Sequence, residues 1–368
     1  MSAQTLRLVP PPPRLTDAPA PNWSQIARLS DDVGLLEHAR NAIPRREHGY
    51  CVDDVSRGLL VASRERQPSA LVVGLAERYL AFLTHAFGPD GQCRNRLSYD
   101  RRWLDEPTTG DWWGRALWGL GTAAARSTVP WIRKEALEAF TIGVRARSPW
   151  PRAMAFAGLG AAEVVRADPR NTAAAALLAD AASAVGVPGR DGTLSHGPGW
   201  EWPEPELTYA NPALAEVVIA AGDLLGDESL LADGLRMLDW LCRMQEHNGH
   251  LSTVPVGGWR PGVPKHRHDQ QPIEAAATAD ACASAAAITG DDRWDKPLFQ
   301  AIAWFLGDND VNTVMYDAQT GGGYDGLKPD GPNLNQGAES TLALISTLQH
   351  ARELAARRSA TRPSGGLA

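Results

Sequence analysis

Acidic and amide side chains stand at the start of the last apolar segment of the sequence, which reads NQGAESTLALISTL. Asn335, Gln336 and Glu339 fall just before this segment or in its first turn. A carboxyl group can transfer a proton, and two carboxyl groups that flank a bond can cleave it by acid–base catalysis. Amide groups both donate and accept hydrogen bonds, which suits a ligand rich in hydroxyl groups. We therefore expect a polar site where this segment begins.

The same arrangement recurs where other apolar segments begin. Their approaches and first turns carry acids and amides, namely Asp53, Asp54, Asp111, Glu204, Glu206, Asp269, Gln270, Gln271 and Glu274, with Asp325 in the loop before Gly337. Any one of these acids has a structural alternative, because Asp is a common N-cap and Glu in a first turn interacts favourably with the helix dipole. One such acid can be explained as a helix cap, but acids and amides that recur where several apolar segments begin are stronger evidence, and they predict one shared polar site.

Aromatic residues accompany these acids. The chain has 13 tryptophans, and many lie in loops, among them Trp103, Trp112, Trp113, Trp150, Trp200, Trp202 and Trp259. An indole face can stack on the C–H face of a sugar ring, although it can also simply fill space between helices. We expect the ligand to contact Trp112, Trp202, Tyr209, Asn211 and Asp100.

Basic residues near the acids admit two interpretations. Arg57 and Arg115 lie one turn into their helices, where they can orient carboxylates through paired hydrogen bonds or form buried salt bridges between helices. Histidine titrates near neutral pH, so His268 can act as an acid or a base, and His48 and His196 lie in comparable loops. We expect His268 to contact the ligand.

Two kinds of helix are predicted to alternate along the chain. One kind is rich in small residues and apolar almost all round, and it is expected from Asp53, Trp112, Pro151, Leu207, Pro272 and Gly337. The other kind is amphipathic, and it is expected from Ser24, Pro68, Val129, Asn171, Glu228 and Arg293. A helix that is apolar all round must be buried, whereas one with a polar face lies at the surface. Strict alternation therefore predicts an all-α double ring of six inner and six outer helices.

The connections predict where the site lies in this ring. Links out of the inner helices are short, and links into them are mostly long and rich in Trp, Gly, Pro and acidic residues. Long loops in a compact domain are usually functional. The site is therefore expected at the N-terminal ends of the inner helices.

Composition excludes several classes of protein. The 368 residues are 43% hydrophobic and 21% charged, as in folded globular proteins, and the net charge of −7 offers no basic field for nucleic acid or anionic lipid. No apolar run is long enough to span a membrane, and no signal peptide is recognised, so a cytoplasmic location is expected. The four cysteines lack CxxC spacing, and His266 and His268 lack a third ligand, so neither a metal nor a cofactor is expected.

The chain is expected to form one domain. A proline-rich N-terminal arm over residues 1–23 is predicted to be flexible, residues 24–357 to form the ring, and residues 358–368 to be a disordered tail. A homodimer is left open.

Taken together, the pattern resembles the six-hairpin (α/α)6 toroids over about residues 24–355. This superfamily includes glucoamylase-like and other glycoside hydrolases, phosphorylases, some polysaccharide lyases and N-acylglucosamine 2-epimerases. A bacterial group of such toroids, often encoded near glycosyltransferases and β-mannoside phosphorylases, has segments similar to GYCVDDVSRGLL, SYDRRW, GRALWGLG, WEWPEPELTYAN, DQQPIEA, GGGYDGL and NLNQGAEST of this chain.

The resemblance implies a carbohydrate-active enzyme with an (α/α)6 barrel. Glucoamylase-like toroids take one catalytic carboxylate from the middle of the chain and one from near its end. The resemblance therefore implies Glu204 or Glu201 as the acid and Glu339 as the base, with Asp54 as a rival for either role. The expected function is an inverting glycoside hydrolase acting on a short oligosaccharide or glycoside.

Three alternatives stay open. A glycoside phosphorylase needs an anion site, which Arg57, Arg101, Arg102 and Arg115 could supply. The resemblance also allows a sugar epimerase or isomerase that uses loop histidines for proton transfer. A third possibility is a toroid that binds a glycan without catalysis. A lyase is disfavoured, because the acidic residues around the site would repel a uronate polymer.

Overall fold

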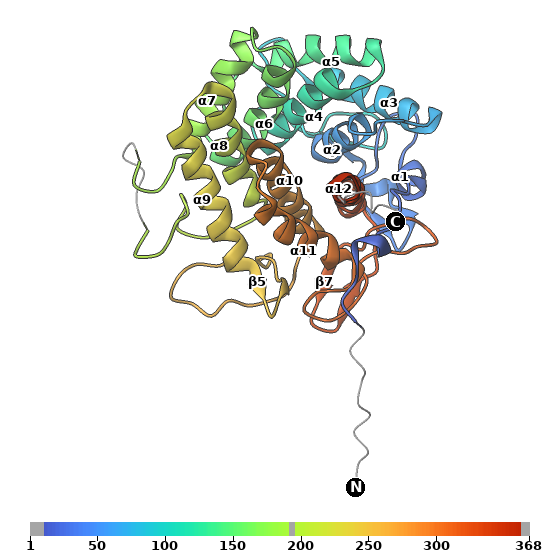
Figure 1. Ribbon diagram of the computed structural model, residues 1–368. Helices are drawn as coiled ribbons and strands as arrows, with labels where there is room; N and C mark the ends of the chain where they lie inside the picture. Colours follow the sequence, from blue (N-terminus) through green and yellow to red (C-terminus); the bar gives the residue numbers. More distant parts are fainter. Residues whose placement is uncertain (1–10, 191–195, 362–368) are drawn as a thin grey trace, which may run out of the picture.

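A computed structural model describes residues 11–190 and 196–361 of the chain, and within them it confirms the all-α (α/α)6 barrel. Six inner helices contact one another in sequence order, and α12 closes the ring against α2 (Figure 1). The inner helices are α2 (Val52–Ser63), α4 (Asp111–Arg126), α6 (Pro151–Ala167), α8 (Pro212–Leu225), α10 (Pro272–Thr289) and α12 (Ala338–Thr361).

Six outer helices surround this ring. Each of them packs against inner helices, and α1 near the beginning of the chain lies against α12 near its end. The outer helices are α1 (Ser24–Leu29), α3 (Ala70–Ala86), α5 (Pro130–Gly143), α7 (Thr172–Val185), α9 (Glu228–Gln245) and α11 (Asp295–Leu306). The helix predicted from Ser24 is shorter than expected, because the segment from Ser30 to Tyr50 forms turns and short bridges instead.

Burial follows the two predicted kinds of helix. Every residue of α8 from Pro212 to Gly222 is buried, whereas α5 buries only one face. The two kinds also begin differently. The outer helices α3, α7 and α9 are capped by the side chains of Ser69, Asn171 and Asp227, whereas no side chain caps α2, α4 or α10. The acids that open these inner helices are therefore not used as caps.

Glycines allow α4 and α6 to pack closely. A Cβ atom on Gly160 of α6 would lie 2.2 Å from the carbonyl oxygen of Leu117, and one on Gly121 of α4 would lie 2.2 Å from the carbonyl oxygen of Gly160. Backbone atoms cannot move aside as a flexible side chain can. The inner ring therefore depends on small residues at this contact.

We expect Gly160→Ala to lower the free energy of unfolding by about 1–3 kcal/mol, because the added methyl group overpacks the contact between α4 and α6. Gly74→Ala in α3 is the matched control, since a Cβ there meets no atom within 4 Å. That control should be neutral or stabilising by about 1 kcal/mol, because alanine favours a helix. Denaturant unfolding of both variants measures the difference, and equal midpoints would contradict the proposed role of Gly160.

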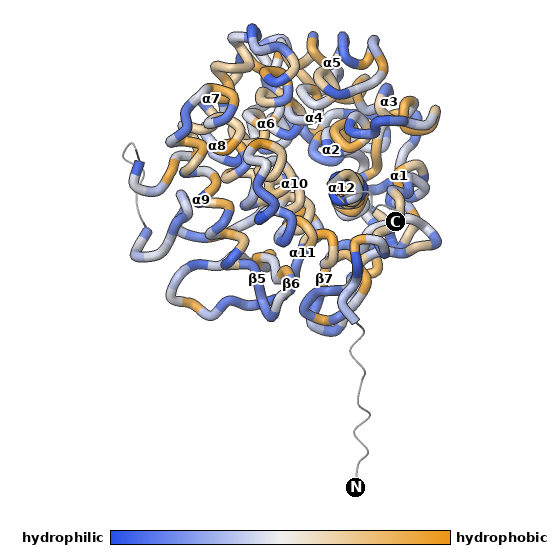
Figure 2. The backbone as a smooth tube through the Cα atoms, in the orientation of Figure 1, coloured by the Kyte–Doolittle hydropathy of each residue, from blue (hydrophilic) through white to orange (hydrophobic). Residues whose placement is uncertain are grey.

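Short antiparallel strand pairs occupy the loops that lead into the inner helices. Four pairs are present in the described residues, and the loops around β5 and β7 are largely hydrophilic (Figure 2). The pairs are β1 (Ala39–Arg40) with β2 (Ile43–Pro44), β3 (Tyr50–Cys51) with β4 (Arg96–Leu97), β5 (Glu246–His247) with β6 (His250–Leu251), and β7 (Gly326–Lys328) with β8 (Gly331–Asn333). Three short 3-10 helices complete the elements, η1 (Leu15–Asp17), η2 (Arg46–His48) and η3 (Asp292–Trp294).

The two ends of the chain were predicted to be a flexible arm and a disordered tail, and the structure describes part of each. From residue 11 the predicted arm is described, and its helix η1 contacts α11 and α12. The first ten residues of that arm lie outside the described residues. The predicted tail begins inside α12, and its residues 362–368 also lie outside. No helix in the described part of the chain is both long and apolar enough to cross a membrane.

Candidate active site

Two adjacent cavities lie at the N-terminal ends of the inner helices and share four lining residues. One part has a volume of about 510 Å³ and the other about 340 Å³, and both are lined by Asp53, Arg57, Gln271 and Glu339. The larger part also contacts Asn95, Asp111, Trp112, Arg115, Trp150 and Tyr209, and the smaller part Glu37, His38, Cys51, Asp54, Arg96 and Asp325. We call the two parts together the front cavity. It lies where the long loops were predicted to converge.

One guanidinium group joins the first and last inner helices in this cavity. Arg57 of α2 contacts an Asp54 carboxylate oxygen at 2.6 Å through Nη1 and a Glu339 oxygen at 2.7 Å through Nη2. Because both contacts are made by the same planar group, the two carboxylate oxygens lie no more than roughly 8 Å apart. Of the two roles considered for Arg57, orienting carboxylates and bridging helices, the structure shows both.

The two carboxyl groups held by Arg57 have different surroundings. The Asp54 side chain is only 3% exposed, and its second oxygen accepts a hydrogen bond from the Cys51 thiol at 3.2 Å. Burial raises the pKa of Asp54 to about 7, with the neighbouring Glu339 and Glu37 carboxylates adding to the rise and Arg57 opposing it. The Glu339 side chain is 36% exposed and faces the cavity. A protonated and an accessible carboxyl group can therefore coexist near neutral pH.

Two further acidic residues, Asp53 and Asp111, line the larger part of the front cavity together with Glu339. Asp53 lies 3.4 Å from the Arg115 guanidinium, and burial raises the pKa of Asp53 while the two nearby arginines oppose the rise. The Arg115 guanidinium packs 3.9 Å from the centre of the Phe156 ring. Asp111, at the start of α4, accepts a hydrogen bond from the hydroxyl group of Tyr209, which comes from the loop before α8. This contact joins the start of α4 to the loop before α8 at the larger part of the cavity.

The aromatic residues divide into two groups. Trp112 lines the cavity, where its indole N–H donates to the Cys93 carbonyl group at 2.8 Å, and Trp150 lines it with 64% of its surface exposed. Trp202 does not line it, because this side chain is fully buried and stacks on Trp240 of α9. The predicted ligand contact of Trp202 therefore has no support here, and the space-filling alternative accounts for its position.

Glu204 and Glu201, the acids proposed from the middle of the chain, do not line the front cavity. Both oxygens of Glu204 are held by the guanidinium group of Arg152, at 2.5 and 2.8 Å. Glu201 lies 3.5 Å from Arg236 of the outer helix α9. Each carboxylate is thus engaged by an arginine away from the cavity lining.

Most of the predicted amides hold loops in place. Gln270 is fully buried and bonds to Asp310 and to the Trp304 indole. Gln336 accepts from Thr320 at 2.6 Å, and Asn335 accepts from the backbone of Asn41 at 3.0 Å. Gln271 differs, because it lines both parts of the front cavity.

Two more predicted ligand contacts are buried in a network behind the cavity. Glu274 accepts from the backbone N–H of Ala210 and lies 3.4 Å from the side-chain amide of Asn211, which is itself fully buried. Burial raises the pKa of Glu274 to about 7. Neither residue lines the cavity, so this network fixes the turn that leads into α8.

Three further predicted residues lie in loops outside the cavity lining. Asp100 accepts from Ser98 in an exposed turn, and its other oxygen lies 3.3 Å from Arg102. Asp269 is exposed, and its backbone carbonyl accepts from Val256. His268 is half-buried, and its Nδ1 has no hydrogen-bond partner among the described residues.

Sequence reasoning missed several residues that line the cavity, and four of them come from two loop stretches. Glu37 and His38 belong to a stretch that was predicted to be helical, and Asn95 and Arg96 precede or form β4. Arg96 pairs with Glu37. The exposed Arg96 lies between the buried Asn95 and Leu97, which is a weak strand signal, and no local pattern connects this strand to the region of Glu37.

One group of potential metal ligands occurs in the described residues. Atoms of Glu37, Cys51 and Asp54 lie within 4.8 Å of one another. However, Arg96 already pairs with Glu37 and Arg57 with Asp54, and burial raises the pKa of the Cys51 thiol, which must lose its proton to bind a metal. This donor set suits guanidinium partners better than a metal ion.

Solved structures of other proteins share this architecture. A sugar epimerase from a ruminal bacterium matches with a TM-score of 0.66 and 13% identity, over 90% of this chain and 95% of its own. Cellobiose 2-epimerase from Bacillus thermoamylovorans matches with a TM-score of 0.68 and 11% identity, over 89% and 95%. The GH76 alpha-mannanase of Bacteroides thetaiotaomicron matches with a TM-score of 0.55 and 11% identity, over 85% and 88%.

These similarities confirm the (α/α)6 toroid fold that the sequence predicted. At such low identity they establish the fold alone. No protein-family model matches the chain, and no curated protein matches its sequence.

Proposed function

We propose that the protein is a carbohydrate-active enzyme that hydrolyses a glycosidic bond in a short oligosaccharide or glycoside bound in the front cavity. The observation that carries this proposal is the pairing of Asp54 and Glu339 on one guanidinium group. Two carboxyl groups with different surroundings are what glycoside cleavage requires, one to protonate the leaving oxygen and one to activate water or attack the sugar.

The two carboxyl groups can be assigned roles. Asp54 is the candidate acid, because its raised pKa of about 7 keeps a proton available near neutral pH. Glu339 is the candidate base, because it is the more accessible of the two and lies 2.7 Å from the Arg57 guanidinium at the cavity. Their limit of roughly 8 Å admits both the separation of about 5–5.5 Å found in retaining enzymes and the shorter part of the range of about 6.5–9.5 Å found in inverting ones. Trp112 and Trp150 offer aromatic surfaces for a sugar ring in the same cavity.

A phosphorylase has less support from the geometry. Arg101 pairs with Asp32 at 2.6 Å and Arg102 lies beside Asp100, and neither lines the front cavity. Arg57 and Arg115, which do line it, already face carboxylates. A phosphate would have to compete with those carboxylates.

A sugar epimerase or isomerase is the second candidate. Solved structures with this fold include epimerases, and His38 lines the smaller part of the front cavity 3.6 Å from Glu37. This histidine could move a proton at a sugar carbon next to a carbonyl group. None of the predicted histidines, His48, His196 and His268, lines the cavity.

One experiment separates these activities. The protein is incubated with a panel of disaccharides and aryl glycosides, with and without phosphate, and with free monosaccharides in deuterated water. We expect release of reducing sugar without phosphate. Sugar phosphate formed only with phosphate would indicate a phosphorylase, and deuterium at the carbon next to the carbonyl group, without any cleavage, would indicate an epimerase. Either result would overturn the proposed hydrolysis.

A further inference from the structure

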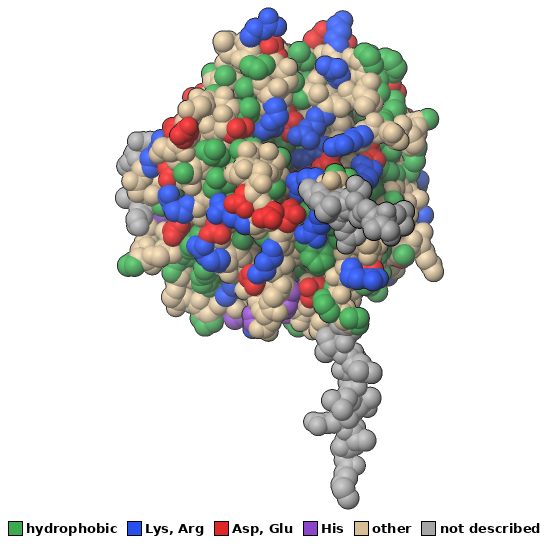
Figure 3. All heavy atoms as spheres, viewed as in Figure 1, with side chains coloured by type: hydrophobic (Ala, Val, Ile, Leu, Met, Phe, Trp, Pro, Cys, Tyr) green, Lys and Arg blue, Asp and Glu red, His purple; other side chains and the backbone are tan. Residues whose placement is uncertain are grey.

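A second pocket lies at the opposite end of the ring from the front cavity, where the inner helices end. It has a volume of about 420 Å³, and a polar or aromatic side chain comes from each inner helix or, for α2, from the residue that follows it. These side chains are Arg64, Trp118, Glu163, Glu216, Asp280 and His350. We call it the rear pocket. Acidic and basic side chains are mixed across the face of the molecule seen along α12 (Figure 3).

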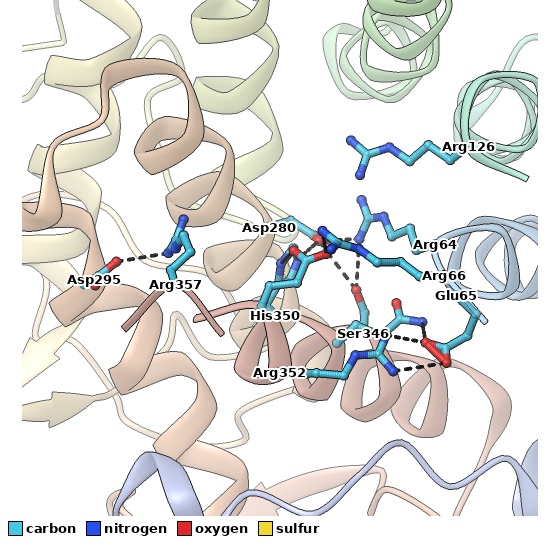
Figure 4. A network of polar contacts seen from close by, with 12 residues as sticks. Arg64, Glu65, Arg66, Arg126, Asp280, Asp295, Ser346, His350, Arg352 and Arg357 are labelled. Atoms are coloured by element: carbon cyan, nitrogen blue, oxygen red, sulfur yellow. Dashed lines mark hydrogen bonds and ion pairs between the residues drawn. The ribbon is translucent and has the colours of Figure 1, made fainter. Parts of the chain in front are cut away.

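The arginines of the rear pocket all have carboxylate partners. Arg64 contacts Asp280 at 2.6 Å and the Ser346 hydroxyl group at 3.1 Å (Figure 4). Arg126 binds both oxygens of Glu163 at 2.7 Å, and Arg166 lies 3.8 Å from the same carboxylate. The positive charges of the pocket are therefore compensated from within the protein.

One carboxyl group of the pocket, that of Glu216, differs from Asp280 and Glu163 because no arginine forms an ion pair with it among the described residues. Glu216 of α8 is only 8% exposed, and its Oε2 has no hydrogen-bond partner among the described residues. Burial raises the pKa of Glu216 to about 8, and the nearby Asp280 carboxylate adds to the rise while Arg64 opposes it. Near neutral pH this buried carboxyl group therefore mostly keeps its proton, and a cationic ligand that displaces the proton would stabilise the carboxylate form.

The charges that line the pocket show which sign that ligand has. Five acids and three arginines line it, and Asp223 at its edge is exposed, two turns after Glu216 on the same helix. When all of these groups are ionised, the five acids outnumber the three arginines and the excess charge is negative. The walls of the pocket also include apolar groups such as Leu159, Ala220 and Ile288. The volume is within the usual range of small-molecule sites.

We propose that the rear pocket binds a small aliphatic amine, whose ammonium group pairs with the Glu216 carboxylate. An ammonium group supplies three hydrogen-bond donors, and the alkyl body packs against the apolar wall. A diamine can place its second ammonium group toward Asp223 at the edge of the pocket. This site is separate from the proposed glycoside cleavage and does not depend on it.

Calorimetric titration with 1,4-diaminobutane tests the proposal on the full chain, with 1,4-butanediol as the neutral analogue and inorganic phosphate as the anion. We expect the diamine to bind, and both the diol and phosphate to bind at least tenfold more weakly. Glu216→Gln should weaken diamine binding at least tenfold, because it removes the counterion while keeping the size of the side chain. Glu246→Gln, which changes an exposed residue of β5 paired with Lys296, should bind as the unaltered protein does.

Thermal unfolding shows whether the Glu216→Gln variant is folded. Glu216→Gln should unfold at the same or a higher temperature than the unaltered protein, since it removes an unpaired buried acid. With folding established in this way, diamine binding that is absent at millimolar concentration, unchanged in Glu216→Gln, or matched by the diol or phosphate overturns the proposal. Diaminobutane should also raise the unfolding temperature of the unaltered protein but not that of Glu216→Gln.

Discussion

Glu339→Gln is expected to lower the turnover number by about 10²–10⁴-fold on the glycoside that the panel identifies, which is the usual contribution of a general acid or base. Glutamine keeps the size of the side chain but cannot accept a proton from water. A catalytic role predicts that the variant loses more in turnover number than it changes in Michaelis constant, even though Glu339 also contacts Arg57. Steady-state kinetics of the purified variant measures both quantities.

Asp54→Asn should cause a loss of similar size and should also change the pH profile. The acid form of Asp54 is lost as pH rises through its pKa of about 7, so the rate should fall on the alkaline side, and this fall should be missing in the variant. Glu204→Gln distinguishes this assignment from the one that the resemblance implied. A large loss of turnover in Glu204→Gln, together with little loss in Asp54→Asn, would return the acid role to Glu204.

Arg64→Met is expected to lower the free energy of unfolding by about 3–5 kcal/mol, the usual cost of removing one partner from a buried ion pair. Arg64 and Asp280 are 10% and 9% exposed, and Asp280 also contacts His350 at 2.6 Å (Figure 4). Methionine fills part of the space but leaves Asp280 with one partner fewer. Arg66→Met is the matched control, because Arg66 is 80% exposed and its pair with Glu353 should contribute about 0–1 kcal/mol.

The pH dependence of unfolding gives an independent check on this buried pair. The Arg64 charge and the hydrogen bond from His350 lower the pKa of Asp280 below its ordinary value, although burial opposes them. A lowered folded-state pKa stabilises the protein above the unfolded-state pKa of about 4, and the contribution is lost as pH falls below it. Arg64→Met should flatten this acid-side loss in denaturant unfolding between neutral pH and pH 3. An unchanged slope would show that Arg64 does not set the pKa of Asp280.

The ring could be predicted because the residues of a single helix already indicate whether that helix is buried. An inner helix such as α8 is apolar all round, and an outer one such as α5 is not, so the alternation is visible without any long-range information. Loop length then shows at which end of the ring the site lies, because the links into the inner helices are mostly long and the links out of them are short. Asp53, Asp54, Asp111 and Glu339 were placed at one end of the ring by this reasoning.

The rest of the site depends on contacts that no local pattern contains. Trp202 and Glu204 come from a loop as rich in Trp and acids as a binding loop would be, yet that loop packs Trp202 on α9 and Glu204 on Arg152. Whether a loop residue faces a cavity or a neighbouring helix is decided by tertiary packing. For the same reason the cavity lining by His38 could not be foreseen, since its stretch folds as turns rather than as the predicted helix.

The closure of the ring has a consequence for biosynthesis. Arg57 and Asp54 pair within α2 and leave the ribosome early, but Glu339, the second partner of Arg57, lies in α12, the last inner helix to be made. Domains begin to fold during translation from the N-terminal side, and here Arg57 must wait for the final inner helix before it meets its second carboxylate. A nascent chain halted before Ala338 would therefore carry most of the toroid and no assembled carboxylate pair, so the enzyme proposed here would acquire activity only when synthesis is nearly complete.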